Sequence, residues 1–165
     1  MKIVELTPVP SVREGVVATK SGKTEKGYLY QPNDIIVGKY VIDRRSYNTD
    51  YTEQSNTDGK VTFIKTRKMS AISKDSLLDN LDEFNSHISQ SWLDIVKAKG
   101  IEAGNDVAYI EDGKLMLVTS ERISDVPSDS TILFNIDEDG KYYNVYYCQN
   151  EKLKSLYVNA NEVLN

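Results

Sequence analysis

The chain has 165 residues, of which 27% are charged and 39% hydrophobic, a composition typical of a globular protein long enough to bury a core. No apolar run approaches the roughly 20 residues that a membrane-spanning helix needs, and a single cysteine excludes an internal disulfide and a thiolate metal cluster. Pro8 and Pro10 interrupt the start where a secretory signal would stay apolar, so we expect a cytoplasmic protein, in a host cytosol or in a virion assembled there.

The formal net charge of -5 is unevenly distributed along the chain. Residues 1–74 hold 13 Lys and Arg against 8 Asp and Glu, a net +5, whereas residues 75–165 hold the other 7 against 17, a net -10. This segregation indicates either two surfaces with different partners or ordinary solvated surface whose signs separated by chance.

The N-terminal part, residues 1–72, has the pattern of strands and turns. Residues 14–20 and 27–45 are strand-like, and the second segment should bend or divide at Pro32. The Gly-Lys-Thr at 22–24 is similar to the end of a phosphate-binding P-loop, but Val17 stands where that loop needs glycine. A turn is therefore predicted there.

One turn sequence occurs three times, as TDGK at 57–60 and as EDGK at 111–114 and 138–141. Asp-Gly supplies the positive φ angles that a tight hairpin requires, and strand-like residues flank each copy. The sequence therefore predicts three antiparallel hairpins.

Residues 74–99 have the periodicity of one long amphipathic helix. Ser73 or Asp75 can cap its start, and Gly100 can close its end. We expect the helix to pack across a sheet through apolar residues at spacings of three and four. These are Leu77, Leu81, Phe84, Ile88, Trp92 and Ile95.

The C-terminal part, residues 105–165, ends in the segments YYNVYY, CQNEKLKS and LYVNANEVL. An aromatic-Val strand, a hairpin and a second aromatic-Val pair in this order make residues 106–165 resemble bacterial SH3-like barrel domains. The resemblance implies a small twisted β-barrel and a binding module. The predicted fold is thus one compact α+β domain over residues 1–165: antiparallel hairpins in an SH3-like or small barrel sheet, with the helix across it.

Candidates for catalysis or metal binding are few. His87 has only Glu83 at helical spacing, and a metal would need further ligands. Cys148 lies in a strand-like run and is typical of a small buried hydrophobe. The acids of residues 135–141 lack the alternating oxygen ligands of a calcium loop. We therefore expect no catalytic residue, metal or cofactor, and a non-enzymatic protein.

The expected function is binding to a protein partner. Abundant Tyr, Asn, Lys, Ile and Asp are typical of an AT-rich genome, as in many phages, so we expect a phage-encoded inhibitor of a host or defence protein, or a virion assembly component. Two alternatives stay open: a nucleic-acid-binding protein using a basic strand beside tyrosines, and a small enzyme built from carboxylates and tyrosines. The candidate binding residues are Arg44, Arg45, Lys65, Arg67, Lys68, Tyr142 and Tyr146.

Overall fold

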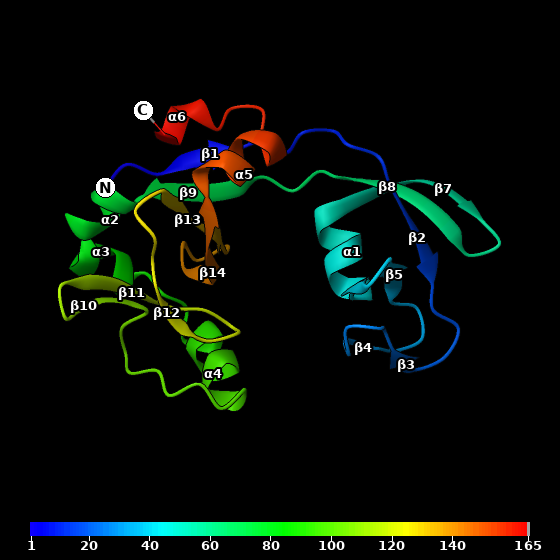
Figure 1. Ribbon diagram of the computed structural model, residues 1–165, viewed down its shortest axis with the longest axis horizontal. Helices are drawn as coiled ribbons and strands as arrows, with labels where there is room; N and C mark the ends of the chain where they lie inside the picture. Colours follow the sequence, from blue (N-terminus) through cyan, green and yellow to red (C-terminus); the bar gives the residue numbers. More distant parts are fainter. Residues whose placement is uncertain (165) are drawn as a thin grey trace. The chain divides into compact units, whose positions relative to one another are not determined.

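The computed structural model describes residues 1–164 and has an α+β architecture with mostly antiparallel sheets (Figure 1). Its contacts divide the chain into two compact units. Unit 1 comprises residues 1–7 and the chain from residue 68 onward, and unit 2 comprises residues 8–67. Unit 2 is thus inserted in the chain between the first strand of unit 1 and that strand's antiparallel neighbour.

Unit 1 contains a four-stranded sheet in the order β1-β9-β13-β14 and a three-stranded sheet in the order β10-β11-β12, both antiparallel. The strands of the first are β1 (Val4–Leu6), β9 (Met69–Ser73), β13 (Ser130–Ile136) and β14 (Tyr142–Gln149). Those of the second are β10 (Ala108–Glu111), β11 (Lys114–Val118) and β12 (Ile123–Asp125).

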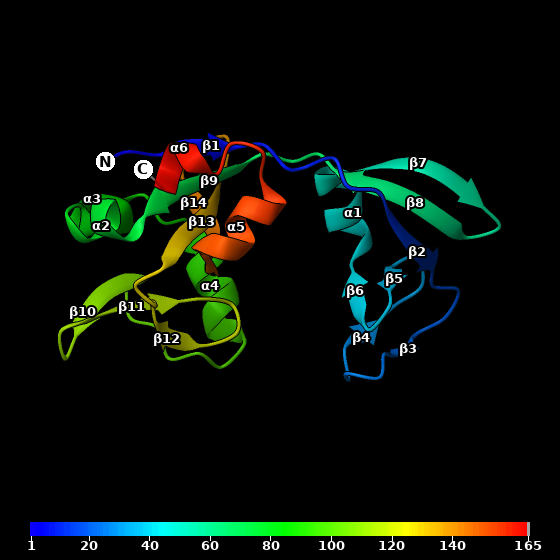
Figure 2. The same ribbon diagram turned by 45° about the horizontal axis from the view of Figure 1, so that its top comes forward.

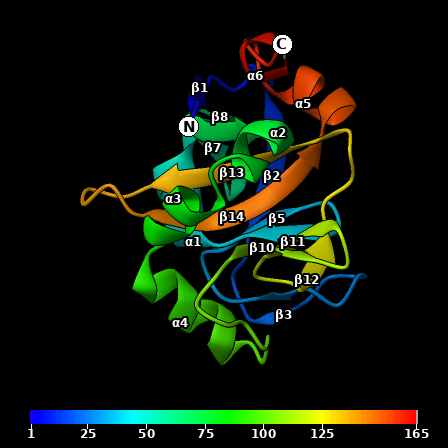
Figure 3. The same cartoon turned by 90° about the vertical axis from the view of Figure 1, so that its left-hand side faces the viewer.

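The four-stranded sheet is covered on both faces because β13 is apolar on both sides and buried from Ser130 to Asn135. Helices α2 (Lys74–Leu78) and α3 (Leu81–Ser86) lie over β13 and β14 on one face (Figure 3). There Phe84, Phe134 and Tyr142 share a core with the three-stranded sheet. Helices α5 (Asn150–Leu156) and α6 (Asn161–Leu164) close the second core (Figure 2).

The predicted helix over residues 74–99 is wrong as a single element. The segment forms α2 (Lys74–Leu78), α3 (Leu81–Ser86) and α4 (Gln90–Ala98). Between α3 and α4 the backbone bonds to a strand instead: Tyr142 N donates to the His87 carbonyl at 2.7 Å, and Ser89 N donates to the Tyr142 carbonyl at 2.8 Å. These two bonds occupy groups that a continuous helix would pair within itself.

The apolar face of the segment was mostly predicted correctly. Ser73 caps α2 by accepting from Ser76 N, and the side chains of Phe84, Ile88 and Trp92 are buried. Leu81 is half-buried, whereas Ile95 is 48% exposed because α4 starts on a new axis and turns Leu93 and Val96 inward instead.

The SH3-like barrel expected over residues 106–165 is not formed, since the described residues contain no closed barrel. The segment after β14 becomes α5 and α6 in place of a second aromatic-Val strand. Strand β14 also bulges: Asn144 and Val145 lie opposite the single residue Phe134. Asn144 has φ 54°, and the extra residue brings Tyr142 and Val145 to the same core, against the simple alternation of the sequence.

Unit 2 is a five-stranded antiparallel sheet in the order β6-β5-β2-β8-β7 with a small β3-β4 ribbon. Helix α1 (Arg44–Asp50) starts where the sequence predicted more strand, because Asp43 caps it by accepting from Ser46 N at 2.8 Å. Its Tyr47 joins Ile35, Val61 and Phe63 in the core. The strands are β2 (Arg13–Val17), β3 (Gly22–Lys23), β4 (Leu29–Tyr30), β5 (Ile35–Val37), β6 (Tyr40–Ile42), β7 (Tyr51–Thr57) and β8 (Lys60–Lys65).

All three predicted hairpins are confirmed: β7-β8, β10-β11 and β13-β14. The first two turn at Asp-Gly pairs with positive φ at both residues, 51° and 85° in one and 51° and 75° in the other. The third is longer, and Asp137 Oδ1 closes it by accepting from Asp139 N and Lys141 N, both at 2.9 Å. In residues 1–164 no helix is long and apolar enough to cross a membrane.

We predict that Phe84→Ala lowers the free energy of unfolding by roughly 3–5 kcal/mol, because Phe84 is fully buried between the rings of Phe134 and Tyr142. Urea denaturation measures the loss. The matched control is Ile95→Ala, which the periodicity placed on the same face but which is half-exposed, so its cost should be about 1 kcal/mol or less. Equal losses for the two variants would contradict the division into three helices.

Candidate functional site

The predicted basic residues do not form one free surface within a single unit. Arg44 is the first residue of α1, where its Nε donates to the Asn33 carbonyl at 2.8 Å and its guanidinium lies 5.2 Å from the Tyr47 ring centre. Arg45 follows it and is exposed. Arg44 is therefore fixed in place by its own unit, and only Arg45 of this pair is fully open to solvent.

The other three basic residues are engaged in local interactions. Lys65 ends β8 opposite Tyr51, and its partial burial lowers the pKa of its ammonium group. Arg67 forms a salt bridge with Asp50 at 3.0 Å. Lys68 belongs to unit 1, where it pairs with Glu5 at 3.5 Å. These contacts reduce the positive charge that the five residues offer to an anionic partner.

A shallow groove of about 400 Å³ beside α1 includes Arg44 and no other predicted basic residue. Its aromatic residues are Tyr47 and Tyr51. Tyr47 is only 3% exposed and donates its hydroxyl to Glu53 at 3.0 Å. Burial, then this hydrogen bond, raises the pKa of Tyr47 to about 12. Since Tyr47 and Tyr51 both pack on Phe63, their rings are part of the core rather than a platform on which bases would stack.

The two predicted tyrosines of β14 have different environments. Tyr142 is 4% exposed and packs against Phe84, Phe134 and the stacked ring of His87, so a partner cannot reach its ring. Tyr146 is half-buried and lines a surface cleft.

His87 and Cys148 make contacts of a structural kind. The Nδ1 of His87 lies 2.8 Å from the backbone carbonyl of Glu83 rather than from its carboxylate. Cys148 is buried in the second core, and burial raises the pKa of its thiol, which disfavours the reactive thiolate. Among the described residues no group of three His, Cys, Asp or Glu side chains could hold a metal ion.

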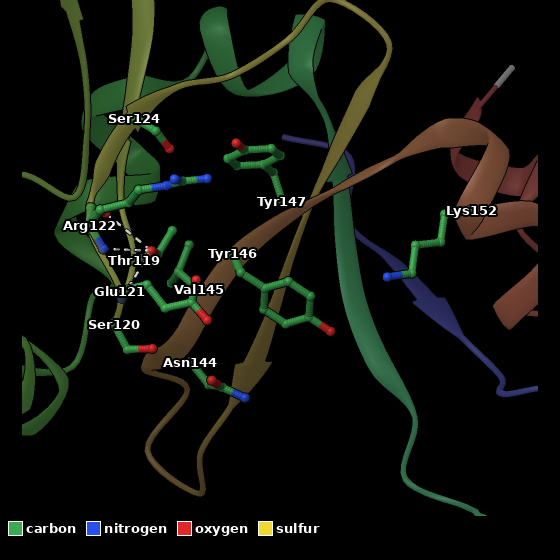
Figure 4. A pocket seen from close by; sticks show the side chains of 10 residues that line it. All are labelled: Thr119, Ser120, Glu121, Arg122, Ser124, Asn144, Val145, Tyr146, Tyr147 and Lys152. Carbon is green, nitrogen blue, oxygen red and sulfur yellow. Dashed lines mark hydrogen bonds between the residues drawn. The ribbon is translucent and has the colours of Figure 1, made fainter. Parts of the chain in front are cut away.

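A cleft of about 530 Å³ opens along the outer side of β14 in unit 1 (Figure 4). We call it the edge cleft, and it is lined by residues 119–122, Ser124, residues 144–147 and Lys152. The hydroxyl of Thr119 fixes its rim by accepting from the backbone N–H groups of Glu121 and Arg122. The cleft is polar, with two cations and one carboxylate among the ten lining side chains.

Sequence reasoning found only Tyr146 of this cleft. Arg122 and Lys152 lie 30 residues apart, in a hairpin loop and in α5, and only the packing of the two sheets brings them to one strand edge. The polar residues Thr-Ser-Glu-Arg at 119–122 indicate a loop, but their pattern does not indicate a ligand-binding site.

Unit 2 exposes an aromatic surface that the sequence analysis also missed. We call it the tyrosine patch: Lys26, Tyr28, Leu29 and Tyr40. The rings of Tyr28 and Tyr40 are 5.7 Å apart and 49% and 54% exposed, and Leu29 is 70% exposed. Lys26 Nζ donates to the Tyr40 hydroxyl at 2.9 Å. The available sequence signal was a tyrosine one or two positions after a glycine, in GYLY and GKYV.

No family model, curated protein or solved structure matches this chain. The assignment of a function therefore depends on the geometry of the tyrosine patch and the edge cleft.

We predict that Tyr47→Phe costs about 1 kcal/mol at neutral pH, because the hydrogen bond to Glu53 is lost. Above pH 10 the unfolded chain releases the Tyr47 proton more readily than the folded chain, so wild-type stability should fall between pH 10 and 12. Tyr47→Phe has no hydroxyl at this position and does not lose stability in this way. Relative to wild type, the variant should therefore gain roughly 2 kcal/mol of unfolding free energy between neutral pH and pH 12.

Urea denaturation at about pH 9 and about pH 11.5 measures this shift. Tyr28→Phe is the matched control, because it makes the same substitution on an exposed ring and should leave the stability at about pH 9 unchanged. The same pH dependence in wild type and Tyr47→Phe would show that the buried hydroxyl does not control stability in this range.

Proposed function

We propose that the protein is a non-enzymatic binding module whose unit 2 contacts a protein partner through the tyrosine patch. The observation that carries the proposal is the exposed contact between the Tyr28 and Tyr40 rings, with the exposed Leu29 next to Tyr28 in the chain. Tyrosine is enriched at the energetically dominant positions of protein interfaces, since its ring is apolar and its hydroxyl is polar.

The patch is preorganised by its own contacts. Lys26 lies 4.7 Å from the Tyr40 ring centre and bonds to its hydroxyl, and this contact raises the pKa of the Lys26 ammonium group. The turn beneath is closed by Thr24 and by Gly27 with φ 83°. Rings that are already held in place lose less conformational entropy on binding.

The charge of unit 2 indicates the kind of partner. It contains 10 Lys and Arg against 7 Asp and Glu, a net charge of +3. This positive charge would attract an acidic protein surface at the rim of the interface, while the tyrosines would supply apolar contacts that salt does not screen. A long polyanion would gain less, because Arg44 and Arg67 are held by local contacts within the unit.

We predict that Tyr28→Ala combined with Tyr40→Ala weakens binding to the partner at least about 30-fold, the effect of losing roughly 2 kcal/mol at dominant interface residues. The partner would be identified by cross-linking in lysate of the native host and purified for titration calorimetry. Both side chains are exposed, so the melting temperature should change little.

The control variant is Val158→Ala, which truncates another exposed apolar side chain, in unit 1. It should leave affinity unchanged. Single- and double-stranded oligonucleotides are titrated in parallel at two salt concentrations. Micromolar oligonucleotide binding at physiological salt with a steep salt dependence would replace this proposal with the nucleic-acid alternative.

A further inference from the structure

The outer edge of β14 is a strand edge that the protein itself leaves largely open. In the four-stranded sheet β14 is the last strand and pairs along its length only with β13. On its outer side, the described residues make a single bridge, between Ile88 and Tyr142 at its beginning. An open edge presents backbone N–H and C=O groups to which another extended chain can bond.

The usable part of this edge is short and defined at both ends. The bulge at Asn144 interrupts regular pairing, and α5 begins at Asn150. Residues 145–149 therefore form a regular edge of about 17 Å, the length of a five-residue strand. The edge cleft lies along the first part of it, at residues 144–147. Val145 is buried there, whereas Tyr147 is half-buried and Gln149 at the far end is exposed, so the accessible backbone lies toward the end of the strand.

Side chains from both faces of the sheet project beside this edge. Tyr147 packs on the first core and Tyr146 on the second, so the two rings lie on opposite faces. In Figure 4, Arg122 lies on the Tyr147 side of β14 and Lys152 on the Tyr146 side. A strand added at this edge would direct alternate side chains to these two environments.

The cations of the edge cleft lack carboxylate partners inside the protein. Neither Arg122 nor Lys152 forms a salt bridge within residues 1–164. They lie in a unit with 10 Lys and Arg against 18 Asp and Glu, a net charge of -8. Ser124, at the wall of the cleft, has a buried Oγ with no hydrogen-bond partner in the described residues. Two cations without carboxylate partners favour carboxylates as ligands.

We infer that the edge cleft binds an extended acidic segment of a partner protein, which adds a strand to β14 and places carboxylates on Arg122 and Lys152. Strand addition obtains affinity from backbone hydrogen bonds and specificity from alternate side chains. Because the two cations lie on opposite faces, the two acidic residues must be separated by an odd number of positions, such as neighbours or i and i+3.

A second copy of this chain is a poorer occupant. Pairing of β14 with its own copy would add the partner's two cations to the same edge and supply only the single carboxylate of Glu121 from the cleft. Like charges brought together at an interface oppose association. The site is also separate from the tyrosine patch, so the inference does not depend on the proposed function of unit 2.

The test uses the full chain and a display library of random nine-residue peptides. We expect selected peptides to be rich in Asp and Glu at odd separations, and the best one to protect amides of residues 145–149 from hydrogen exchange. Arg122→Gln with Lys152→Gln should weaken its binding at least about tenfold, the effect of losing one charge-assisted contact. The matched control, Lys114→Gln with Lys154→Gln, removes two exposed cations that are paired with Asp125 and Glu151 and should have little effect.

N-methylation of the selected peptide separates strand addition from simple anion binding. Methyl groups on one set of alternate residues should abolish binding, because those N–H groups face β14, while methyl groups on the other set should be tolerated. Equal binding of both methylated peptides, or equal competition by free glutamate, would overturn strand addition. Selection of no acidic motif, or protection of residues 145–149 by self-association alone, would also overturn the inference. Tyr28→Ala with Tyr40→Ala should leave peptide binding unchanged.

Discussion

The burial of β13 on both faces is the constraint on which the rest of unit 1 depends. Its residues from Ser130 to Asn135 are buried, and Ile132 and Phe134 face one core while Leu133 faces the other. A strand with apolar side chains on both sides needs a layer on each side. Helices α2 to α4 with the three-stranded sheet supply one layer, and α5 with α6 supplies the other.

This arrangement explains why the strand next to β13 becomes a functional candidate. The covering layers protect the faces of the sheet, and the segment between α3 and α4 bonds to its edge at Tyr142, while Tyr147 and Gln149 further along β14 stay partly or fully exposed. The same two hydrogen bonds interrupt the helical segment. The rest of this edge lies beside Arg122 and Lys152. The two-sided packing that stabilises β13 therefore also leaves β14 as the edge strand that forms the candidate binding surface.

Unit 2 has a different physical basis. Its core is small, with Ile35, Tyr47, Val61 and Phe63 under one short helix, and the ring contacts among Tyr47, Tyr51 and Phe63 fill much of it. Tyrosines inside this core stabilise the unit, whereas Tyr28 and Tyr40 contact each other at the surface. One residue type therefore serves both packing and candidate recognition, and its position in the fold decides which.

The sequence by itself determined the features that depend on neighbouring residues. The Asp-Gly turns, the cap at Ser73 and the burial of Phe84 and Trp92 follow from backbone preference and periodicity, which act over a few residues. The α+β class followed from the same signals. Of the edge cleft, the sequence predicted only Tyr146, because Arg122 and Lys152 are brought together by packing.

Only the tertiary structure decided the features that depend on distant partners. The helical segment is interrupted because His87 and Ser89 bond to Tyr142, more than 50 residues away in the chain. The bulge at Asn144 reverses the alternation of β14, and salt bridges such as Arg67 with Asp50 neutralise cations that appeared available in the sequence. Periodicity and composition contain no information on such pairings, because hydrogen bonds and ion pairs between remote segments depend on distances that only the folded chain defines.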